Sequence, residues 1–312
     1  MKSWSKLTIS LLLFLSITTA PASGEVPAPF SDIDPGDGNY VAISYLQQEG
    51  IIEGYADGTF RPYEKVNRAE AVKMLTLASG LFSEEEFENV IPEFGPFSDT
   101  PANEWYTPYL IAAKDAGIIE GYADDSYKPQ QSVNLAEALK IYLESHDTLL
   151  LPEPEFYTIF ADTPADAWFT PYTSYADARD MLIINHENKI FPEQEMTRGY
   201  LAEIIYRKTM QGLTGAGFGK ATYYGAAVHG NNTASGEVFD MYQMTAAHKT
   251  LPFGTVVRVT NLANGKQVEV TITDRGPYGP GRVIDLTSSA FEQIAELWQG
   301  VIHVQYEVVS TP

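Results

Sequence analysis

Cysteine is absent from all 312 residues. Its absence excludes disulfides, thiolate metal sites, a cysteine nucleophile and a lipid-carrying N-terminal cysteine. Basic residues are scarce, because 20 Lys and Arg stand against 41 Asp and Glu and the net charge is −21. Nucleic acids and anionic lipid surfaces repel such a chain, so we expect neither as a partner. Histidines paired at helical spacing are also missing, and we expect no metal or other cofactor.

Long apolar runs are confined to the N-terminus. Two lysines precede a run from Leu7 to Ile17, and small residues follow it. This is the layout of a secretory signal peptide, and we predict cleavage near Ala22, which makes residues 1–22 the signal. The alternative, an uncleaved membrane anchor, is disfavoured because the run is shorter than the ~20 residues that span a bilayer. The mature chain is therefore expected to be secreted and to have no stable membrane insertion.

Negative charge is unevenly distributed. Residues 219–312 carry six Lys or Arg and eight Asp or Glu, which leaves −19 for everything before them. The chain length predicts about two domains, and a hydrophobic content of 44% lets each bury a core. The two parts therefore differ electrostatically as well as in sequence.

Internal repeats fill the first two thirds of the chain. The eight residues at 50–57 recur without change at 117–124, 67 positions later. The Phe-Ser-Asp at 30–32 recurs at the same offset, and a weaker third copy begins at Phe160. A fixed period of this length is typical of repeat architectures.

Each repeat is predicted to be a helix, a turn and a second helix. Apolar residues at helical spacing, such as Leu110 and Ala113, lead to Gly117, which suits the position after a helix end. The second helix is expected to begin after Asn67, with Glu70 completing a capping box.

These repeats resemble the S-layer homology domain over residues 28–210. The approximate bounds are 28–80, 95–145 and 158–210, with the third repeat degraded. The resemblance implies an α-helical repeat domain that binds a secondary cell-wall polysaccharide, often carrying pyruvate, in grooves between repeats. It also implies a self-contained monomer held at the cell wall or cell surface.

Several residues are candidate ligands of that wall polymer. Arg68 and Arg198 fall on the arginine of the family motif, and a guanidinium can grip a carboxylate through two hydrogen bonds. Trp105 and Trp168 either offer flat faces to sugar rings or pack in the core, and the sequence leaves both roles open. Leu135 replaces the motif arginine in the second repeat, so we expect at least one groove not to function.

Each repeat also opens with an aspartate. Asp99 and Asp162 are further candidate polymer ligands, and Asp32 is their counterpart in the first repeat. Helix N-capping is the alternative role, and we favour it because such carboxylates often accept the first amide N–H groups of a helix.

A glycine-rich segment at 211–219 separates the repeats from the C-terminal part and is predicted to be a flexible linker. Beyond it, alternating strands are predicted at 255–260 and 267–273, joined by an Asn-Gly hairpin turn. Further strands are expected at 221–224, 283–286 and 301–309, and one helix at 289–299. The pattern predicts a small, mostly antiparallel barrel over residues 219–310 and a multi-domain α + β chain.

Four segments of the C-terminal part, at 221–225, 233–241, 245–255 and 273–286, resemble the rare lipoprotein A family of lytic transglycosylases. The resemblance implies a six-stranded double-psi β-barrel that cleaves the β-1,4 bond between MurNAc and GlcNAc in peptidoglycan glycan strands and leaves 1,6-anhydro ends. This chain lacks the family's lipid-bearing cysteine and its C-terminal sporulation-related repeat.

The family's functional positions fall on three residues of this sequence, and the resemblance implies that Asp274, His248 and Glu237 are catalytic. We also expect Tyr224, Arg275 and Asp285 to contact substrate. One carboxyl can serve both steps, because Asp274 can protonate the departing oxygen and then accept the proton of the C6 hydroxyl. This cycle requires a raised pKa for Asp274, from an apolar wall or the charge of Glu237, and pairing with Arg275 would oppose it. Asp285 is also open to a structural role, as a carboxylate that bonds backbone amides.

Three other functions remain open from the residues. A double-psi barrel can bind glycan without cutting it, as in expansin-like proteins. A glycoside hydrolase could use Glu237 and Asp274 as its carboxylate pair and would release reducing ends. A purely structural surface protein fits the repeats but leaves the polar motifs of the barrel unexplained.

Overall fold

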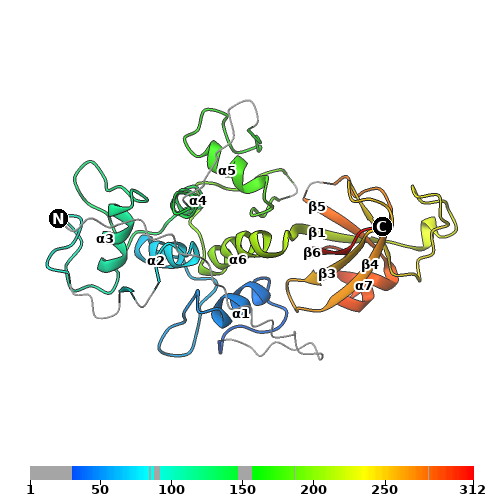
Figure 1. Ribbon diagram of the computed structural model, residues 1–312, viewed down its shortest axis with the longest axis horizontal. Coiled ribbons are helices and arrows are strands. Elements are labelled where there is room, and N and C mark those ends of the chain that lie inside the picture. Colours follow the sequence, from blue (N-terminus) through cyan, green and yellow to red (C-terminus); the bar gives the residue numbers. More distant parts are fainter. Residues whose placement is uncertain (1–29, 84–85, 88–91, 147–156, 186, 280) are drawn as a thin grey trace.

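The computed structural model describes residues 30–83, 86–87, 92–146, 157–185, 187–279 and 281–312. A helical part and a barrel part lie side by side, and α6 runs from the centre of the first to the edge of the second (Figure 1). The predicted signal peptide lies outside the described residues. Among the described helices, none has both the length and the apolar character needed to cross a membrane.

Three helix pairs form the N-terminal part. The outer helices α1, α3 and α5 form three lobes around the inner helices α2, α4 and α6 (Figure 1). The pairs are α1 (Tyr40–Gln48) with α2 (Arg68–Ala78), α3 (Thr107–Asp115) with α4 (Leu135–Glu144), and α5 (Thr170–Asp177) with α6 (Arg198–Thr214). The predicted helix–turn–helix repeats are therefore confirmed.

Helix ends follow the signals read from the sequence. Asn67 and Glu70 form the predicted capping box of α2, and Asn134 with Glu137 repeats it on α4. Gly117 follows α3 with a positive φ of 74°, the left-handed conformation that glycine adopts without strain. Local sequence thus sets where these helices begin and end.

A ring of backbone hydrogen bonds joins the three repeats. The N–H of Val66 donates to the carbonyl of Met196 at 3.0 Å, that of Val133 to Val66 at 3.1 Å, and that of Met196 to Val133 at 2.9 Å. All three side chains are buried in one core. The third repeat is degraded in sequence, yet it supplies one of the three members of this closed ring.

The opening aspartates do not cap helices, so that prediction was wrong. Asp99 accepts the backbone N–H groups of Tyr127 and Lys128, both at 2.7 Å. Asp32 and Asp162 make the same paired contacts 28 and 29 residues further along the chain. Each carboxylate therefore fixes the turn between the two helices of its own repeat, which only the folded chain brings close.

The C-terminal part is a closed six-stranded barrel in the order β1-β5-β2-β4-β3-β6. Pairs β1/β5 and β2/β4 are parallel, and the other neighbours are antiparallel. The strands are β1 (Gly217–Tyr224), β2 (Thr245–His248), β3 (Val256–Asn261), β4 (Gln267–Asp274), β5 (Arg282–Thr287) and β6 (Ile302–Ser310). The predicted barrel is confirmed, but β2 was missed because four residues are too few to show alternation.

The helix predicted at 289–299 is two shorter pieces. These are α7 (Ser288–Ile294) and the 3-10 helix η4 (Leu297–Gln299), and a second 3-10 helix, η3 (Ala226–Val228), follows β1. The carbonyl of Ile294 accepts the side-chain amides of Asn261 at 2.8 Å and Asn264 at 3.0 Å. Because these asparagines come from the end of β3 and the hairpin after it, the interruption is a tertiary effect.

The predicted flexible linker is not present. Helix α6 continues to Thr214, Gly215 ends it with a φ of 68°, and β1 begins at Gly217. Phe218 is only 2% exposed and lies in the core of the repeats, against the ring of Tyr206 at 5.9 Å. The glycines that suggested flexibility provide a helix end and close packing, and the two parts are joined rigidly.

We predict that Phe218→Ala destabilises both parts of the chain together, by about 3–5 kcal/mol, because it leaves a cavity where they meet. Calorimetry should show one unfolding transition in the wild type and a lower midpoint in the variant. Trp298→Ala is the control, since Trp298 is 84% exposed and its loss should change stability by less than about 0.5 kcal/mol. Two separate transitions in the wild type would contradict a shared core.

Candidate functional site

A row of paired residues crosses four strands on one face of the barrel. Thr222 on β1 pairs with Asp285 on β5, Asp285 pairs with Ala247 on β2, and Ala247 pairs with Asp274 on β4. Side chains of directly paired residues lie on the same face of a sheet. Two strand spacings place the α-carbons of the two aspartates about 9–10 Å apart, with only the methyl group of Ala247 between them.

Asp274 is held by backbone groups at the end of β4. Its Oδ1 accepts the N–H groups of Ala234 at 2.9 Å and Arg275 at 2.8 Å. The N–H of Ser235 donates to the carbonyl of Thr273 at 3.0 Å, so the segment between β1 and β2 is pinned to this strand. That segment, yellow in Figure 1, lies at the end of the molecule farthest from the repeats.

Asp285 is the more buried carboxyl of the pair. Its Oδ1 accepts the hydroxyl of Thr222 at 2.7 Å, so its expected role in bonding backbone amides was wrong. Burial raises the pKa of Asp285 above its usual value, and the charge of Asp274 raises it further, while Thr222 and Arg282 act in the opposite direction. The protonated form of Asp285 therefore persists to higher pH than that of an exposed aspartate.

Tyr224 lies beside both carboxyls. Its ring stacks on Phe239 with centroids 4.4 Å apart. Burial, followed by the charges of Asp274 and Asp285, raises the pKa of Tyr224, so its hydroxyl keeps its proton. The hydroxyl oxygen is buried without a hydrogen-bond partner among the described residues. An unpaired buried donor is costly, which marks this point as one where a ligand or water would bind.

Arg275 does not pair with Asp274. Its Nη1 donates to the carbonyls of Leu251 at 2.9 Å and His248 at 3.3 Å, and its guanidinium carbon lies 3.7 Å from the ring centroid of Phe253. The guanidinium of Arg275 is thus bound to the turn after β2. The objection that Arg275 would hold Asp274 in its charged form does not apply to this arrangement.

His248 faces away from the carboxyl pair, because its neighbour Ala247 occupies the row and successive strand residues alternate in direction. Its Nδ1 accepts the N–H groups of Leu251 at 3.0 Å and Thr250 at 3.2 Å, and Nε2 lies 3.2 Å from the hydroxyl of Tyr306. Burial, followed by the charges of Lys249 and Arg275, lowers the pKa of His248 to about 4. The imidazole is therefore neutral near pH 7 and braces the turn that also holds Arg275.

Glu237 lies on the segment that covers the row. Its side chain is exposed and makes no hydrogen bond or ion pair with the residues that the structure describes. Its carbonyl accepts the N–H of Thr233 at 2.8 Å, which closes the turn pinned to Asp274. The same segment carries Asp240, which sequence reasoning missed although it lies within a quoted motif; it accepts the N–H of Tyr242 at 3.0 Å and lies 3.7 Å from Nδ1 of His229.

We predict that His248→Ala lowers the free energy of unfolding at pH 7 by about 1–3 kcal/mol, because the partly buried amide groups of Thr250 and Leu251 lose their acceptor. The folded pKa of His248 lies below the unfolded value of 6.5, so the unfolded state binds the extra proton as the pH falls from 6.5 towards 4. The wild type loses this contribution to stability in that window, and the variant should not. Urea unfolding at pH 7 and pH 5 measures both effects, and equal stability of the two proteins at pH 7 would refute the bracing role.

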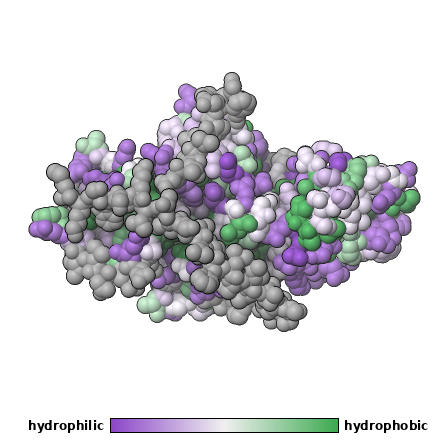
Figure 2. All heavy atoms as spheres, in the orientation of Figure 1, coloured by the Kyte–Doolittle hydropathy of each residue, from purple (hydrophilic) through white to green (hydrophobic). Residues whose placement is uncertain are grey.

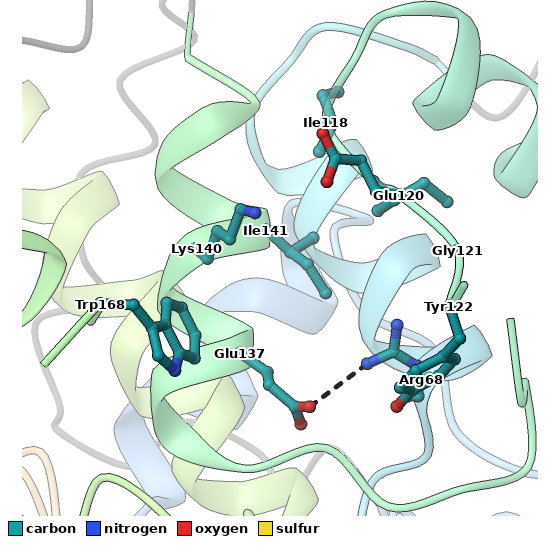
Figure 3. A pocket seen from close by; sticks show the side chains of 10 residues that line it. Arg68, Ile118, Glu120, Gly121, Tyr122, Glu137, Lys140, Ile141 and Trp168 are labelled. Carbon is teal, nitrogen blue, oxygen red and sulfur yellow. Dashed lines mark hydrogen bonds and ion pairs between the residues drawn. The ribbon is translucent and has the colours of Figure 1, made fainter.

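Two grooves between repeats have matching linings. The first contains Arg68 from α2, Glu137 and Lys140 from α4, Tyr122 and Trp168 (Figure 3). The second repeats this set with Arg198, Glu70, Lys73, Tyr55 and Trp105. In each, an arginine of one repeat meets a glutamate of the next, at 3.5 Å for Arg68–Glu137 and 3.3 Å for Arg198–Glu70.

Trp105 and Trp168 are 50% and 54% exposed, so the core-packing alternative was wrong for both. They form part of the groove linings, where an indole face is available to a sugar ring. Asp99 and Asp162 do not line either groove, and their oxygens are occupied by backbone amides.

The third groove is chemically different. It is lined by Leu135 in place of the arginine and Tyr200 in place of the glutamate, with Ile183 and Ile190 beside them. It therefore lacks the charged pair that the other two grooves share. Among the described residues, no cluster of histidine and acidic side chains is placed to hold a metal ion.

The fold and the site define a class: a barrel domain with a carboxyl pair, joined rigidly to a repeat domain with two charged grooves. Residues 217–306 match the family described as lytic transglycolase, and residues 29–72 and 96–139 match the S-layer homology domain. The barrel and the first two repeats thus match the two families that the sequence resembles.

Curated relatives match part of the chain. The endolytic peptidoglycan transglycosylase RlpA of Vibrio cholerae is 47% identical over 36% of this chain and 41% of its own length. The probable endolytic peptidoglycan transglycosylase RlpA of Treponema pallidum is 55% identical over 28% of this chain and 27% of its own. The RlpA of Campylobacter jejuni is 34% identical over 45% of this chain and 53% of its own. The chain therefore spans about half, or less, of the length of these relatives.

Proposed function

We propose that this protein is a secreted peptidoglycan lytic transglycosylase, held at the cell wall by its repeats. The observation that carries the proposal is the pair Asp274 and Asp285, set on one face of a lytic transglycolase barrel in unlike environments. Pairs of titratable groups whose surroundings favour different protonation states are typical of acid–base catalysis. The names of the curated relatives support the same substrate.

In this proposal the two carboxyls divide the work that the sequence assigned to Asp274 alone. Asp285, whose pKa burial raises, donates its proton to the glycosidic oxygen as the bond from C1 of MurNAc to GlcNAc breaks. The C6 hydroxyl of the same MurNAc bonds to C1, and Asp274 takes the hydroxyl proton. The products are a GlcNAc end with a free hydroxyl and a 1,6-anhydro-MurNAc end, and no water is consumed. Proton exchange with solvent then restores both carboxyls.

Hydrolysis is the second candidate, and one observation favours it. The row leaves room between Asp274 and Asp285, and a pair of carboxyls separated by a water molecule is the arrangement of inverting glycosidases. Here Asp285 would again be the acid and Asp274 would activate the water. Glu237, the partner that the sequence suggested for this reaction, is exposed on the covering segment. The two reactions differ in product, since hydrolysis leaves reducing ends.

We predict that Asp274→Asn and Asp285→Asn each reduce the rate of glycan cleavage by about 10²–10⁴-fold, the usual contribution of acid–base groups. Mass spectrometry of purified peptidoglycan after digestion should find 1,6-anhydro-MurNAc ends with the wild type and few with either variant. Glu269→Gln is the control, because Glu269 lies on β4 but pairs with Arg258 on the surface. Reducing ends in place of anhydro ends would establish the hydrolase, and full activity in both variants would exclude this site.

The pH dependence of the same reaction tests the role of Asp285. A proton donor works only while protonated, so the rate should fall as the pH rises through the raised pKa of Asp285. The wild type and the control Glu269→Gln should show this loss of rate at alkaline pH. The residual activity of Asp285→Asn should not show it. A decline that persists in that variant would assign the titrating group elsewhere.

For the repeats we propose binding of a secondary cell-wall polysaccharide in the two charged grooves. Arg68 and Arg198 are buried beneath tyrosine rings and supply donors for a carboxylate on the polymer, and Trp168 and Trp105 supply stacking faces. The third groove lacks the arginine and is not part of the proposed polymer site. The chain is proposed to act as a monomer, because the ring of repeats closes within one chain.

We predict that Arg68→Gln and Arg198→Gln each weaken binding to isolated cell walls by about 10-fold or more, as expected for loss of a charge-assisted contact. The double variant should remain in the supernatant of a wall sedimentation assay. Arg258→Gln is the control, since Arg258 pairs with Glu269 on the barrel and lines neither groove. Circular dichroism checks that the helices persist, and unchanged sedimentation of a folded double variant would contradict groove binding.

A further inference from the structure

One face of β1 connects the proposed active site to the repeats. Phe218, Lys220, Thr222 and Tyr224 alternate onto this face. Phe218 lies in the repeat core, Thr222 bonds Asp285, and Tyr224 lies beside the carboxyl pair. Lys220 stands between them, about 7 Å from Thr222 along the strand. The α-carbon of Lys220 therefore lies about the length of one sugar ring from that of Thr222.

A pocket surrounds Lys220 where the barrel meets the third repeat. The cavity is about 200 Å³, and its barrel wall includes Lys220, Lys249, Arg282 and Val283. Its repeat wall includes Asp177, Asp180, Ile184 and Arg207. The Nζ of Lys220 donates to the carbonyl of Ile184 at 3.0 Å, which fixes the lysine at the seam. Neither family alone supplies this pocket, because it requires the rigid junction of the two parts.

Positive charge prevails on the barrel wall of this pocket, although the protein as a whole carries −21. Lys249 and Arg282 are exposed and have no ion-pair partner among the described residues. Arg207 is neutralised by Glu203 at 2.8 Å, and both of these side chains are 2% exposed. The carboxyls of Asp177 and Asp180 on the repeat wall are fewer than the three cations on the barrel wall, so the pocket keeps an excess of positive charge.

The positions of the barrel-wall cations indicate which part of a glycan would bind in the pocket. Lys220 pairs with Arg282 across β1 and β5, and a register shift at Ala221 separates this pair from the pair Thr222 and Asp285. Lys249 directly follows β2 and lines the same pocket as Lys220 and Arg282. A glycan that crosses the carboxyl pair would therefore bring its next substituent over these cations. The substituent that recurs on each muramic acid of the glycan carries a carboxylate.

We propose that this pocket is a subsite for a carboxylate carried by the glycan substrate, bound by Lys220, Lys249 and Arg282 with the third repeat as its second wall. The carboxylate is either the free lactyl group of MurNAc or a terminal group of its stem peptide. The inference rests on the proposed function for its substrate. It adds that the repeat domain takes part in substrate selection as well as in anchoring.

The test compares three ligands by isothermal titration calorimetry with the full-length mature chain. All proteins carry Asp274→Asn so that the ligand is not cut. The ligands are a peptide-free MurNAc–GlcNAc tetrasaccharide, the same tetrasaccharide with stem tetrapeptides, and a GlcNAc tetrasaccharide, which has no carboxylate. Lys249→Gln with Arg282→Gln is the test variant, and Lys266→Gln, an exposed lysine in the β3–β4 hairpin, is the control.

We expect a carboxylate-bearing ligand to bind about 10-fold or more tightly than the GlcNAc tetrasaccharide, and this advantage to be lost in the test variant alone. A preference for the peptide-free ligand would assign the lactyl group, and a preference for the peptide-bearing ligand would assign the stem peptide. Equal affinities for all three ligands, or an advantage that survives in the test variant, would overturn the subsite. Anhydro-end formation by the chain with Asp274 restored is measured separately, so failure of the chemistry and failure of the subsite remain distinct.

Discussion

Strand β1 belongs to two cores at once, and the arrangement of the whole molecule depends on this. Its first residues pack with the repeats through Phe218, and its later residues line the barrel and its polar face. The preceding turn at Gly215 leaves no free segment between α6 and the strand. Helix α6 and strand β1 therefore connect the repeats directly to the barrel (Figure 1).

The carboxyl pair gains its proposed chemistry from unequal surroundings. Asp274 sits at a strand end where backbone N–H groups hold it, whereas Asp285 is enclosed beside a threonine hydroxyl. Ala247 keeps the two apart without filling the space above it. In the orientation of Figure 2 the barrel surface is largely hydrophilic, with hydrophobic residues in small patches, which suits a polar and hydrated glycan better than an apolar ligand.

The repeats show how one backbone arrangement tolerates the loss of a binding motif. The ring through Val66, Val133 and Met196 uses main-chain groups and buried apolar side chains, so it is kept in all three repeats. The charged groove motif uses side chains alone, and it is absent where Leu135 and Tyr200 replace arginine and glutamate. Substitution at a groove therefore removes a charge without opening the ring.

The sequence by itself determined the repeats, their capping boxes and the barrel, and it predicted Asp274 as a site residue, because each leaves a local pattern of spacing or motif. It did not determine β2, the end of α7 at Ile294 or the stiff junction, since these depend on contacts with residues distant in the chain. The contacts of His248 and Asp285 were likewise decided by tertiary structure. Burial and strand register decide which side chains face each other and which hold a proton. Neither burial nor register can be read from the sequence alone.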